Sequence, residues 1–319
     1  MEFEFEEQNR TASKLSVAVY GPSGSGKTCA MFKIAMGIRD QLYPGEKLKD
    51  IALFIDTERG SSTKAVGRNV GGETLEPFEL YAFEPPFDIV RLSKLVEYAI
   101  NIKHKKIIVI DSYTAFWSGM EGILDRVANL DVELGASKKL YGAWSEKEIV
   151  TKKNILKNLM TNSEAHMIIG FRAKTEYVLE VNSRGKTTPK AIGLKEDMQQ
   201  DVRFEFDVVI SLDKDTHEAE VVKDRIGYLE FKQTSENPNS PITIQDGRDL
   251  ARIVSEGVSS EEVMKRKLNT YINFILDEKA HKSSKVQSFE KAKGVTITKE
   301  YLDTLDYDKL QKLVNYFKD

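Results

Sequence analysis

Residues Gly21–Thr28 read Gly-Pro-Ser-Gly-Ser-Gly-Lys-Thr, which is the spacing G-x-x-x-x-G-K-T. In such a loop the glycines let backbone N–H groups close around phosphate oxygens, and the lysine adds a full positive charge for the terminal phosphates. A threonine hydroxyl directly after the lysine is a hard oxygen ligand for Mg²⁺. The loop therefore predicts a site for a nucleoside triphosphate with Mg²⁺, and ATP is the nucleotide that we expect.

The residues on either side supply the strand and the helix that such a loop needs. Leu15–Tyr20 is a short, β-rich apolar run, and Cys29–Arg39 has apolar residues at helical spacing. The helix N-terminus adds its positive dipole end to the site. The predicted phosphate-site residues are Gly21, Pro22, Ser23, Gly24, Ser25, Gly26, Lys27, Thr28 and Cys29. We expect Cys29 to pack within the helix rather than to serve a redox role.

Two further apolar runs end in acidic residues. Lys106–Ser112 reads Lys-Ile-Ile-Val-Ile-Asp-Ser, and its Asp111 is expected to hold Mg²⁺, through water, opposite Thr28. Hydrolysis also needs a group that orients or deprotonates water, and no acid directly follows Asp111. Leu53–Gly60 reads Leu-Phe-Ile-Asp-Thr-Glu-Arg-Gly, so Glu58 leaves its strand at the same sheet edge. Glu58 is the candidate base, and an ordinary exposed glutamate in a turn is the alternative.

Composition sets limits on the kind of protein. The chain has 319 residues, 40% of them hydrophobic, which suffices for a sizeable core and one small extra domain. Its net charge of −3 excludes a globally basic protein, so a polyanion site must be a local patch. A single cysteine fits a reducing cytosol. The acidic first ten residues lack the apolar stretch of a signal peptide, and no apolar run reaches transmembrane length, so we expect a cytoplasmic protein without a membrane partner.

The pattern of elements predicts an α/β fold with a mostly parallel central sheet flanked by helices, because short β-rich runs alternate with helical patterns. We expect residues 1–255 to form this core, with its last strands antiparallel, and residues 259–319 to form a small helical domain or appendage. Residues 119–142 and 180–201 are predicted to be long loops. The predicted strands are Ser16–Tyr20, Ile51–Asp56, Lys106–Asp111, Ala165–Phe171, Val208–Leu212 and Ala219–Val222, and the predicted helices are Thr28–Arg39, Asp88–Lys103 and Ser145–Asn162.

Taken in order, Gly21–Thr28, Phe-Ile-Asp-Thr-Glu at 54–58 and Ile-Ile-Val-Ile-Asp-Ser at 107–112 resemble the core of RecA-type recombinases. In that family the glutamate after the second strand is the hydrolytic base, so the resemblance assigns this role to Glu58. More narrowly, the chain resembles short RecA-like ATPases of bacteriophages. Some of these act as recombination or single-strand annealing helpers alongside single-strand-binding protein. The resemblance covers about residues 15–229 and implies ATP and Mg²⁺ as cofactors, with single-stranded DNA and single-strand-binding protein as partners.

Val221–Arg225 reads Val-Val-Lys-Asp-Arg, which places Lys223 and Arg225 two apart at a strand end and therefore on one face. RecA-like and DnaB-like motors carry such a basic pair where it reaches the ATP of the neighbouring subunit. The resemblance thus implies a catalytic role in trans, in which positive charge is placed on the γ-phosphate, and a homo-oligomer that forms a ring or filament. Two solvated cations after a strand are the alternative.

Phe171–Lys190 carries five basic and two acidic residues, a net charge of 5 − 2 = +3, together with Tyr177. A basic loop with an adjacent aromatic suits contact with a single-stranded backbone, and a solvated β-hairpin is the alternative. Gly170-Phe171-Arg172 stands where RecA has an Asn-Gln pair, so coupling of the ATP state to DNA either runs through Arg172 or is absent. The candidate DNA-binding residues are Arg172, Lys174, Arg184, Lys186 and Lys190.

Together these features predict a Mg²⁺-dependent ATPase that acts on single-stranded DNA in phage homologous recombination, strand annealing or replication, in the host cytoplasm if the chain is phage-encoded. A hexameric DnaB-like helicase or translocase is an alternative with the same core. A small-molecule kinase also uses a phosphate loop, but it needs neither the 54–58 nor the 221–225 motif. Residues 259–319 carry 12 basic and 10 acidic residues, which fits DNA, a partner protein or a solvated surface.

Overall fold

The computed structural model describes residues 12–60, 62–134, 142–161, 164–181, 187–198, 202–228, 240–256, 260–281 and 284–318. Backbone contacts place residues 14–255 in one compact unit and the residues from Glu256 onward in another. The two predicted domains stay a prediction, because compact units in one structure do not show independent folding.

The core unit is built on one sheet with the strand order β10-β9-β1-β7-β6-β2-β5. All neighbours on this path are parallel except β10 and β9, which are antiparallel. The predicted α/β fold with a mostly parallel sheet is therefore confirmed, as is the antiparallel pairing of the last strands. The strands are β1 (Ser16–Gly21), β2 (Ala52–Asp56), β5 (Glu79–Ala82), β6 (Ile107–Asp111), β7 (His166–Val181), β8 (Thr187–Glu196), β9 (Val208–Leu212) and β10 (Ala219–Asp224), with a separate pair formed by β3 (Asn69–Val70) and β4 (Glu73–Thr74).

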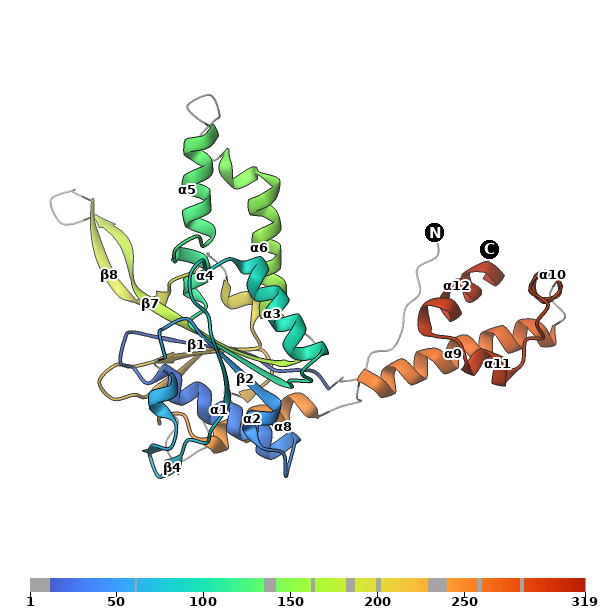
Figure 1. Cartoon of the computed structure of the whole chain (residues 1–319), viewed down its shortest axis with the longest axis horizontal. Helices are drawn as coiled ribbons and strands as arrows, with labels where there is room; N and C mark the ends of the chain where they lie inside the picture. The colour runs from blue at the N-terminus through green and yellow to red at the C-terminus, as the bar shows by residue number, and fades with distance from the viewer. Residues whose placement is uncertain are drawn as a thin grey trace. The chain divides into compact units, whose positions relative to one another are not determined.

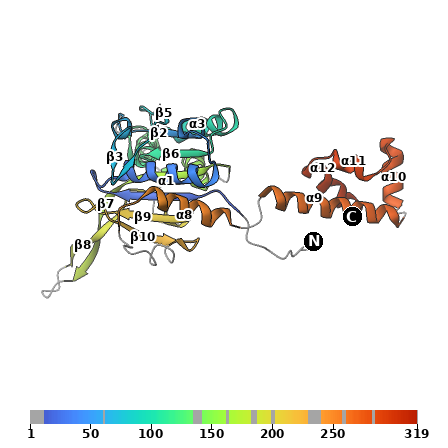
Figure 2. The ribbon, with the colours of Figure 1, turned by 90° about the horizontal axis from the view of Figure 1, so that it is seen from below.

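Helices cover both faces of the sheet (Figures 1 and 2). One layer contains α1 (Lys27–Leu42), α2 (Leu48–Ile51) and α8 (Ile244–Ser255), and the other contains α3 (Ile89–Asn101), α4 (Thr114–Ser118), α5 (Ile123–Leu134) and α6 (Lys147–Met160). Strand β1 serves both layers, since Val17 and Val19 pack on the first and Ala18 and Tyr20 on the second. A strand that is covered on both faces is apolar throughout, which explains the continuous run in the sequence.

Two stretches that were predicted to be long loops contain regular structure, so that prediction is wrong. Residues 119–142 include α5, whose Ile123, Val127 and Leu130 are buried at helical spacing. This periodicity outweighs the Gly, Asp and Lys content of the stretch. Residues 180–201 include β8, which pairs antiparallel with the outer part of β7. The basic segment 171–190 therefore lies largely in a β-hairpin, which projects from the sheet in Figure 1.

The two tryptophans pack inside the core unit, as expected for residues of this size. Trp117 is 7% exposed, and its ring centroid lies 6.0 Å from that of Trp144. They join the ends of α4 and the 3₁₀ turn Ala143–Ser145, which precedes α6. Both rings therefore report on the packing of this helical layer.

The C-terminal unit is helical, with α9 (Ser260–Ala280), α10 (Ser284–Lys293), α11 (Lys299–Asp303) and α12 (Tyr307–Lys318). Its core includes Ile275, Ile297, Leu310 and Phe317. The sequence indicated short helices here, but α9 is 21 residues long. Among the described residues of the whole chain, no helix has the length and apolar character to cross a bilayer.

Candidate nucleotide site

The predicted phosphate loop joins the end of β1 to the start of α1. Gly24 and Gly26 have φ values of 85° and 86°, in the left-handed region that favours glycine. A Cβ atom on Gly21 would lie 2.8 Å from the backbone oxygen of Leu212 and closer still to the hydroxyl of Ser25. The loop is therefore too tight for a side chain at its first position. Among the remaining predicted residues, Pro22 O accepts a 3.2 Å bond from Ser25 N, Ser23 is exposed, and Cys29 is half-buried in α1.

Lys27 folds back over the loop. Its Nζ donates to the backbone oxygens of Gly21 at 3.0 Å and Pro22 at 2.9 Å, and the residue is 8% exposed. Burial is the main cause that lowers the pKa of Lys27, and the nearby carboxylates of Asp111 and Glu58 oppose it. A buried cation of this kind is stabilised by added negative charge. The arrangement thus suits a bound polyphosphate.

Thr28 and Asp111 are brought together as predicted. Thr28 Oγ1 donates to Asp111 Oδ2 at 2.6 Å, whereas Asp111 Oδ1 has no hydrogen-bond partner among the described residues. Burial is the largest cause that raises the pKa of Asp111 to about 6; the bond from Thr28 lowers it and the charge of Glu58 raises it further. A threonine hydroxyl beside a buried carboxylate with a free oxygen is a donor set that fits Mg²⁺.

Glu58 is placed by the residue that ends β2. Asp56 lies opposite Asp111 in the sheet register, and its Oδ1 accepts a 2.6 Å bond from Glu58 N. Its Oδ2 accepts bonds from the backbone N–H and the hydroxyl of Ser62. Asp56 therefore shapes the turn and leaves Glu58 as the acid whose carboxylate is 27% exposed at this edge.

The turns after β2 and β6 are tied to each other. Thr57 Oγ1 accepts a 2.9 Å bond from Ser112 N and donates to Ser112 O at 3.1 Å, and Thr57 N donates to Asp111 O at 2.8 Å. The Asp111–Ser112 peptide is cis. These bonds fix Glu58 and Asp111 relative to each other through the backbone. Sequence reasoning missed Thr57, whose only signal was its position between the two acids of the 54–58 motif.

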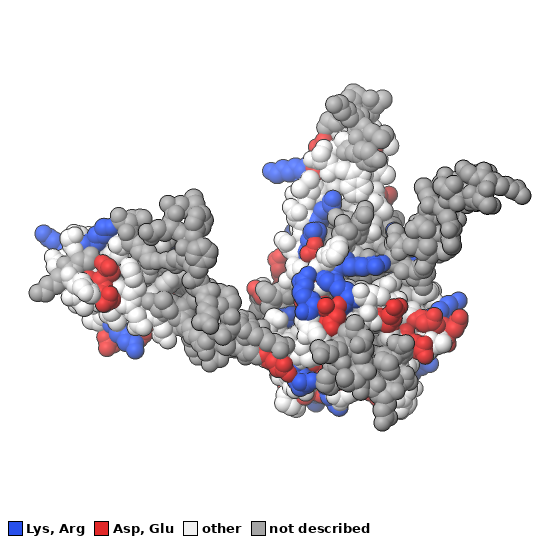
Figure 3. All heavy atoms as spheres, turned by 180° about the vertical axis from the view of Figure 1, so that it is seen from behind, with Lys and Arg blue, Asp and Glu red and all other residues white. Residues whose placement is uncertain are grey.

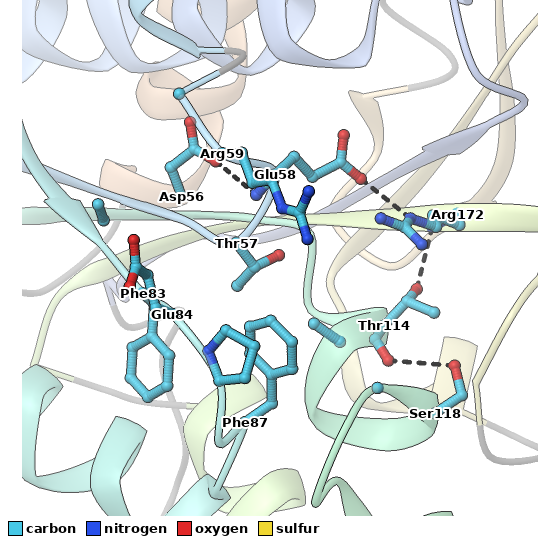
Figure 4. Close-up of a pocket in the computed structure, with 15 residues that line it drawn as sticks. Asp56, Thr57, Glu58, Arg59, Phe83, Glu84, Phe87, Thr114, Ser118 and Arg172 are labelled. Atoms are coloured by element: carbon cyan, nitrogen blue, oxygen red, sulfur yellow. Dashed lines mark hydrogen bonds and ion pairs between the residues drawn. The ribbon is translucent and has the colours of Figure 1, made fainter.

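Arg172 pairs with the candidate base. Its Nε lies 3.0 Å from Glu58 Oε1, and its backbone N–H donates to Thr114 Oγ1 at 3.0 Å (Figure 4). Two residues earlier on β7, a Cβ atom on Gly170 would lie 3.2 Å from Asp111 Oδ1. One strand therefore pairs with the predicted base through Arg172 and lies close beside the predicted metal-binding carboxylate at Gly170. The sequence singled out Arg172 but did not predict its partner.

A cavity of about 900 Å³ opens beside Glu58 (Figure 4). It is lined by the ends of β2 and β5, the start of α4, and Arg172. Aromatic and charged side chains meet in it, among them Phe83, Phe87, Arg59 and Glu84. The candidate base thus lies between the phosphate loop and a second space that can receive another ligand.

Lys223 and Arg225 both bond to backbone oxygens in or next to the 3₁₀ turn Val202–Glu205 of their own chain, as expected for residues on one face. Lys223 Nζ donates to the backbone oxygens of Arg203 at 2.8 Å and Phe206 at 2.5 Å, and Arg225 Nη2 donates to Phe204 O at 2.6 Å. Both side chains therefore close the 3₁₀ turn Val202–Glu205. Their predicted action on a neighbouring subunit stays a prediction.

The candidate DNA-binding residues are only partly described. Arg172 contacts Glu58, and Lys174 Nζ pairs with Asp197 at 2.7 Å. Arg184 and Lys186 lie outside the described residues, and Lys190 is placed by its backbone alone, opposite Val178 in the hairpin. On the face shown in Figure 3, basic side chains gather in the middle of the core unit with acidic ones beside them. Contact with DNA stays a prediction.

Comparison with protein families places the core of the chain. No curated protein matches the chain. A family model described as "AAA domain" matches residues 13–239, which is more than two thirds of the chain. The matched range contains Lys27, Thr28, Glu58 and Asp111, so the geometry above lies within it. The chain therefore belongs to the AAA domain family and has the nucleotide-binding P-loop ATPase core of that family.

Proposed function

We propose that this chain is a Mg²⁺-dependent ATPase whose hydrolysis is coupled to single-stranded DNA, in recombination, strand annealing or replication of a bacteriophage. The observation that supports the proposal most directly is the course of strand β7, which connects the nucleotide site to the hairpin. The strand lies beside the predicted metal-binding carboxylate at Gly170 and pairs with the predicted base through Arg172, and from Ala173 onward it pairs with β8 in the projecting hairpin. Two of the basic residues that suit a DNA backbone, Lys174 and Lys190, belong to this hairpin.

The residues divide the chemistry among them. Lys27 binds the terminal phosphates, and Thr28 and Asp111 hold Mg²⁺, which neutralises charge on the transferred group. Glu58 orients and deprotonates the attacking water. Asp56 and Thr57 position Glu58, because their bonds fix the turn that carries it. In this structure Arg172 occupies Oε1 of Glu58, so separation of the pair would leave both carboxylate oxygens open to water.

The pair between Arg172 and Glu58 is suited to release. The two side chains are 61% and 27% exposed, and ion pairs of this exposure contribute about 0–1 kcal/mol. A ligand phosphate that offers Arg172 a closer partner can therefore take it from Glu58. We infer that phosphates of single-stranded DNA do so, which frees the base and stimulates hydrolysis.

The test is an ATPase assay with and without single-stranded DNA, repeated across protein concentrations. We expect DNA to raise the rate and Glu58→Gln to bind ATP without turnover. Glu84→Gln is the matched control, since Glu84 lines the same cavity and is exposed. Normal hydrolysis by Glu58→Gln would refute the assignment of Glu58 as the base. An ATPase rate that is the same with and without DNA at every protein concentration would refute the coupling of hydrolysis to DNA.

Further assays on the same protein distinguish the ATPase proposal from a helicase or translocase and from a small-molecule kinase. Steady strand unwinding by a ring of fixed size would favour a helicase or translocase, and phosphate transfer to a metabolite without a response to DNA would favour a kinase. Mixing Arg225→Ala with Lys27→Ala chains tests action in trans, which predicts partial recovery of activity at mixed interfaces. Because Arg225 also closes a turn of its own chain, circular dichroism must first show that Arg225→Ala is folded.

A further inference from the structure

The C-terminal unit contains a pocket that the ATPase chemistry does not use. It has a volume of about 610 Å³ and lies between α10 and α12, next to α11. Its walls are mostly apolar and come from helices that share one small core. The apolar residues that line it are Phe289, Ala292, Tyr301, Leu305, Leu313 and Tyr316.

Helical spacing explains how the pocket forms. On α12, the pocket is lined by residues at positions i, i+3, i+4 and i+7, which share one face of a helix: Lys309, Lys312, Leu313 and Tyr316. The ring centroid of Phe289 on α10 lies 6.1 Å from that of Tyr316 and 5.9 Å from that of Phe317. These ring contacts anchor the walls in the core of the unit. The pocket is thus part of the packed structure.

The rim of the pocket is positively charged. Every charged residue that lines it is a lysine, namely Lys293, Lys309 and Lys312. Asp306 pairs with Lys309 at 2.8 Å, while no acidic side chain within the described residues forms an ion pair with Lys293 or Lys312. One ion-paired aspartate beside three lysines leaves an excess of positive charge among the described side chains of the rim. Figure 3 shows basic and acidic side chains together on one face of this unit.

We infer that this pocket binds an acidic peptide of a partner protein, with a large apolar side chain of the peptide in the pocket and its carboxylates on Lys293 and Lys312. The apolar walls favour a buried side chain, and the lysine rim favours adjacent acids. Nucleic acid fits less well. Phe289 is packed against Tyr316 and Phe317, so base stacking would depend on Tyr316, which is 48% exposed, and most of the pocket wall would stay uncovered.

The inference is tested by fluorescence polarisation with the full chain and a labelled peptide, Asp-Asp-Glu-Asp-Leu-Phe. We expect binding that weakens at least tenfold when Lys293 and Lys312 are both replaced by Ala, and also when the Leu and Phe of the peptide become Ser. Replacement of both Lys291 and Lys299 by Ala is the matched control, because these lysines lie in the same unit outside the pocket and should leave binding unchanged.

Three results would overturn the inference. One is peptide affinity that does not change when Lys293 and Lys312 are replaced, in chains shown by circular dichroism to be folded, or when the Leu and Phe of the peptide are replaced. Another is a labelled dT20 oligonucleotide that binds more tightly than the peptide with the same lysine dependence. The third is a chain lacking residues 1–11 that binds the peptide at least tenfold more tightly, since the acidic, Phe-containing segment of the chain itself would then be the occupant. ATP hydrolysis measured on the same variants keeps this test separate from the proposed function.

Discussion

Replacing Asp111 with Asn should stabilise the nucleotide-free chain, although Asp111 is a predicted metal-binding residue. Asp111 is 2% exposed, and its Oδ1 has no hydrogen-bond partner within the described residues. Burial is the largest cause that raises its pKa, and the bond from Thr28 offsets only part of the rise. An amide of the same shape removes the buried charge and keeps an oxygen that accepts the bond from Thr28.

The size of the stabilisation expected for Asp111→Asn follows from the pKa of Asp111. In the folded chain the pKa of Asp111 rises from 3.8 to about 6, so loss of the proton opposes folding. At about 1.4 kcal/mol per pKa unit, the full penalty is about 3 kcal/mol. The penalty builds as the pH rises from the unfolded pKa to the folded pKa, and it is complete above pH 6. About half is present at pH 5, so the advantage of the variant should grow between pH 5 and pH 8 by roughly half of the full penalty.

Urea unfolding of both chains at pH 5 and pH 8, without nucleotide, measures this difference. Fluorescence of Trp117 and Trp144 reports on the core unit, since both rings pack within it. His166 contributes the opposite pH dependence, because burial lowers its pKa to about 3 and stability falls as the pH drops below 6.5. The two chains share His166, so its contribution cancels in the comparison.

Addition of Mg²⁺ and ATP should make the wild-type chain more stable than Asp111→Asn. The bound cation pairs with the carboxylate of Asp111 but not with an amide, so the wild-type chain should gain more stability from the ligands. An advantage of Asp111→Asn that does not change between pH 5 and pH 8 would refute the buried-charge reasoning. A variant that is less stable than the wild type at pH 8 would do so as well.

Three further substitutions test other parts of the site. Gly21→Ala should lower the melting temperature and abolish nucleotide binding measured by calorimetry, because a Cβ atom there meets Ser25 and a backbone oxygen; unchanged binding would contradict this. Arg172→Ala should raise basal hydrolysis and remove its response to DNA, since Glu58 loses its partner; a DNA response of wild-type size would count against it. Lys223→Ala should cost about 1–3 kcal/mol in urea unfolding, because two backbone oxygens lose a charged donor, and an unchanged midpoint would show that the contact is not stabilising.

The main strands were predictable because their signals are local. Ala52–Asp56 and Ile107–Asp111 are buried apolar runs that end in acids, as strands covered by helices on both faces must be. Strand Glu79–Ala82 was missed, since it has four residues, all of them partly or fully exposed, and therefore no apolar pattern. Helix Ile123–Leu134 was missed because the composition of its flanks was given more weight than its periodicity.

The site shows the same division between local and distant signals. Thr28 and Asp111 were predicted to meet because each lies at a fixed position in a recognisable motif, and the parallel sheet brings these motifs to one edge. The contact between Arg172 and Glu58 joins residues 114 positions apart, and it depends on the strand order. The contacts of Lys223 were not predictable either, since backbone oxygens of a short turn leave no mark in the sequence.

Strand pairing also limits how a signal can pass between the hairpin and the nucleotide site. Arg172 is the last residue of β7 that pairs with β1, opposite Gly21, and Ala173 is the first that pairs with β8. The inner part of β7 is paired on both sides, with β1 and β6, so it cannot slide without breaking two ladders of hydrogen bonds. The side chain at this junction offers a direct route by which a change in the hairpin can reach the site. Arg172 pairs with the candidate base, so the proposed coupling would depend on its release from Glu58.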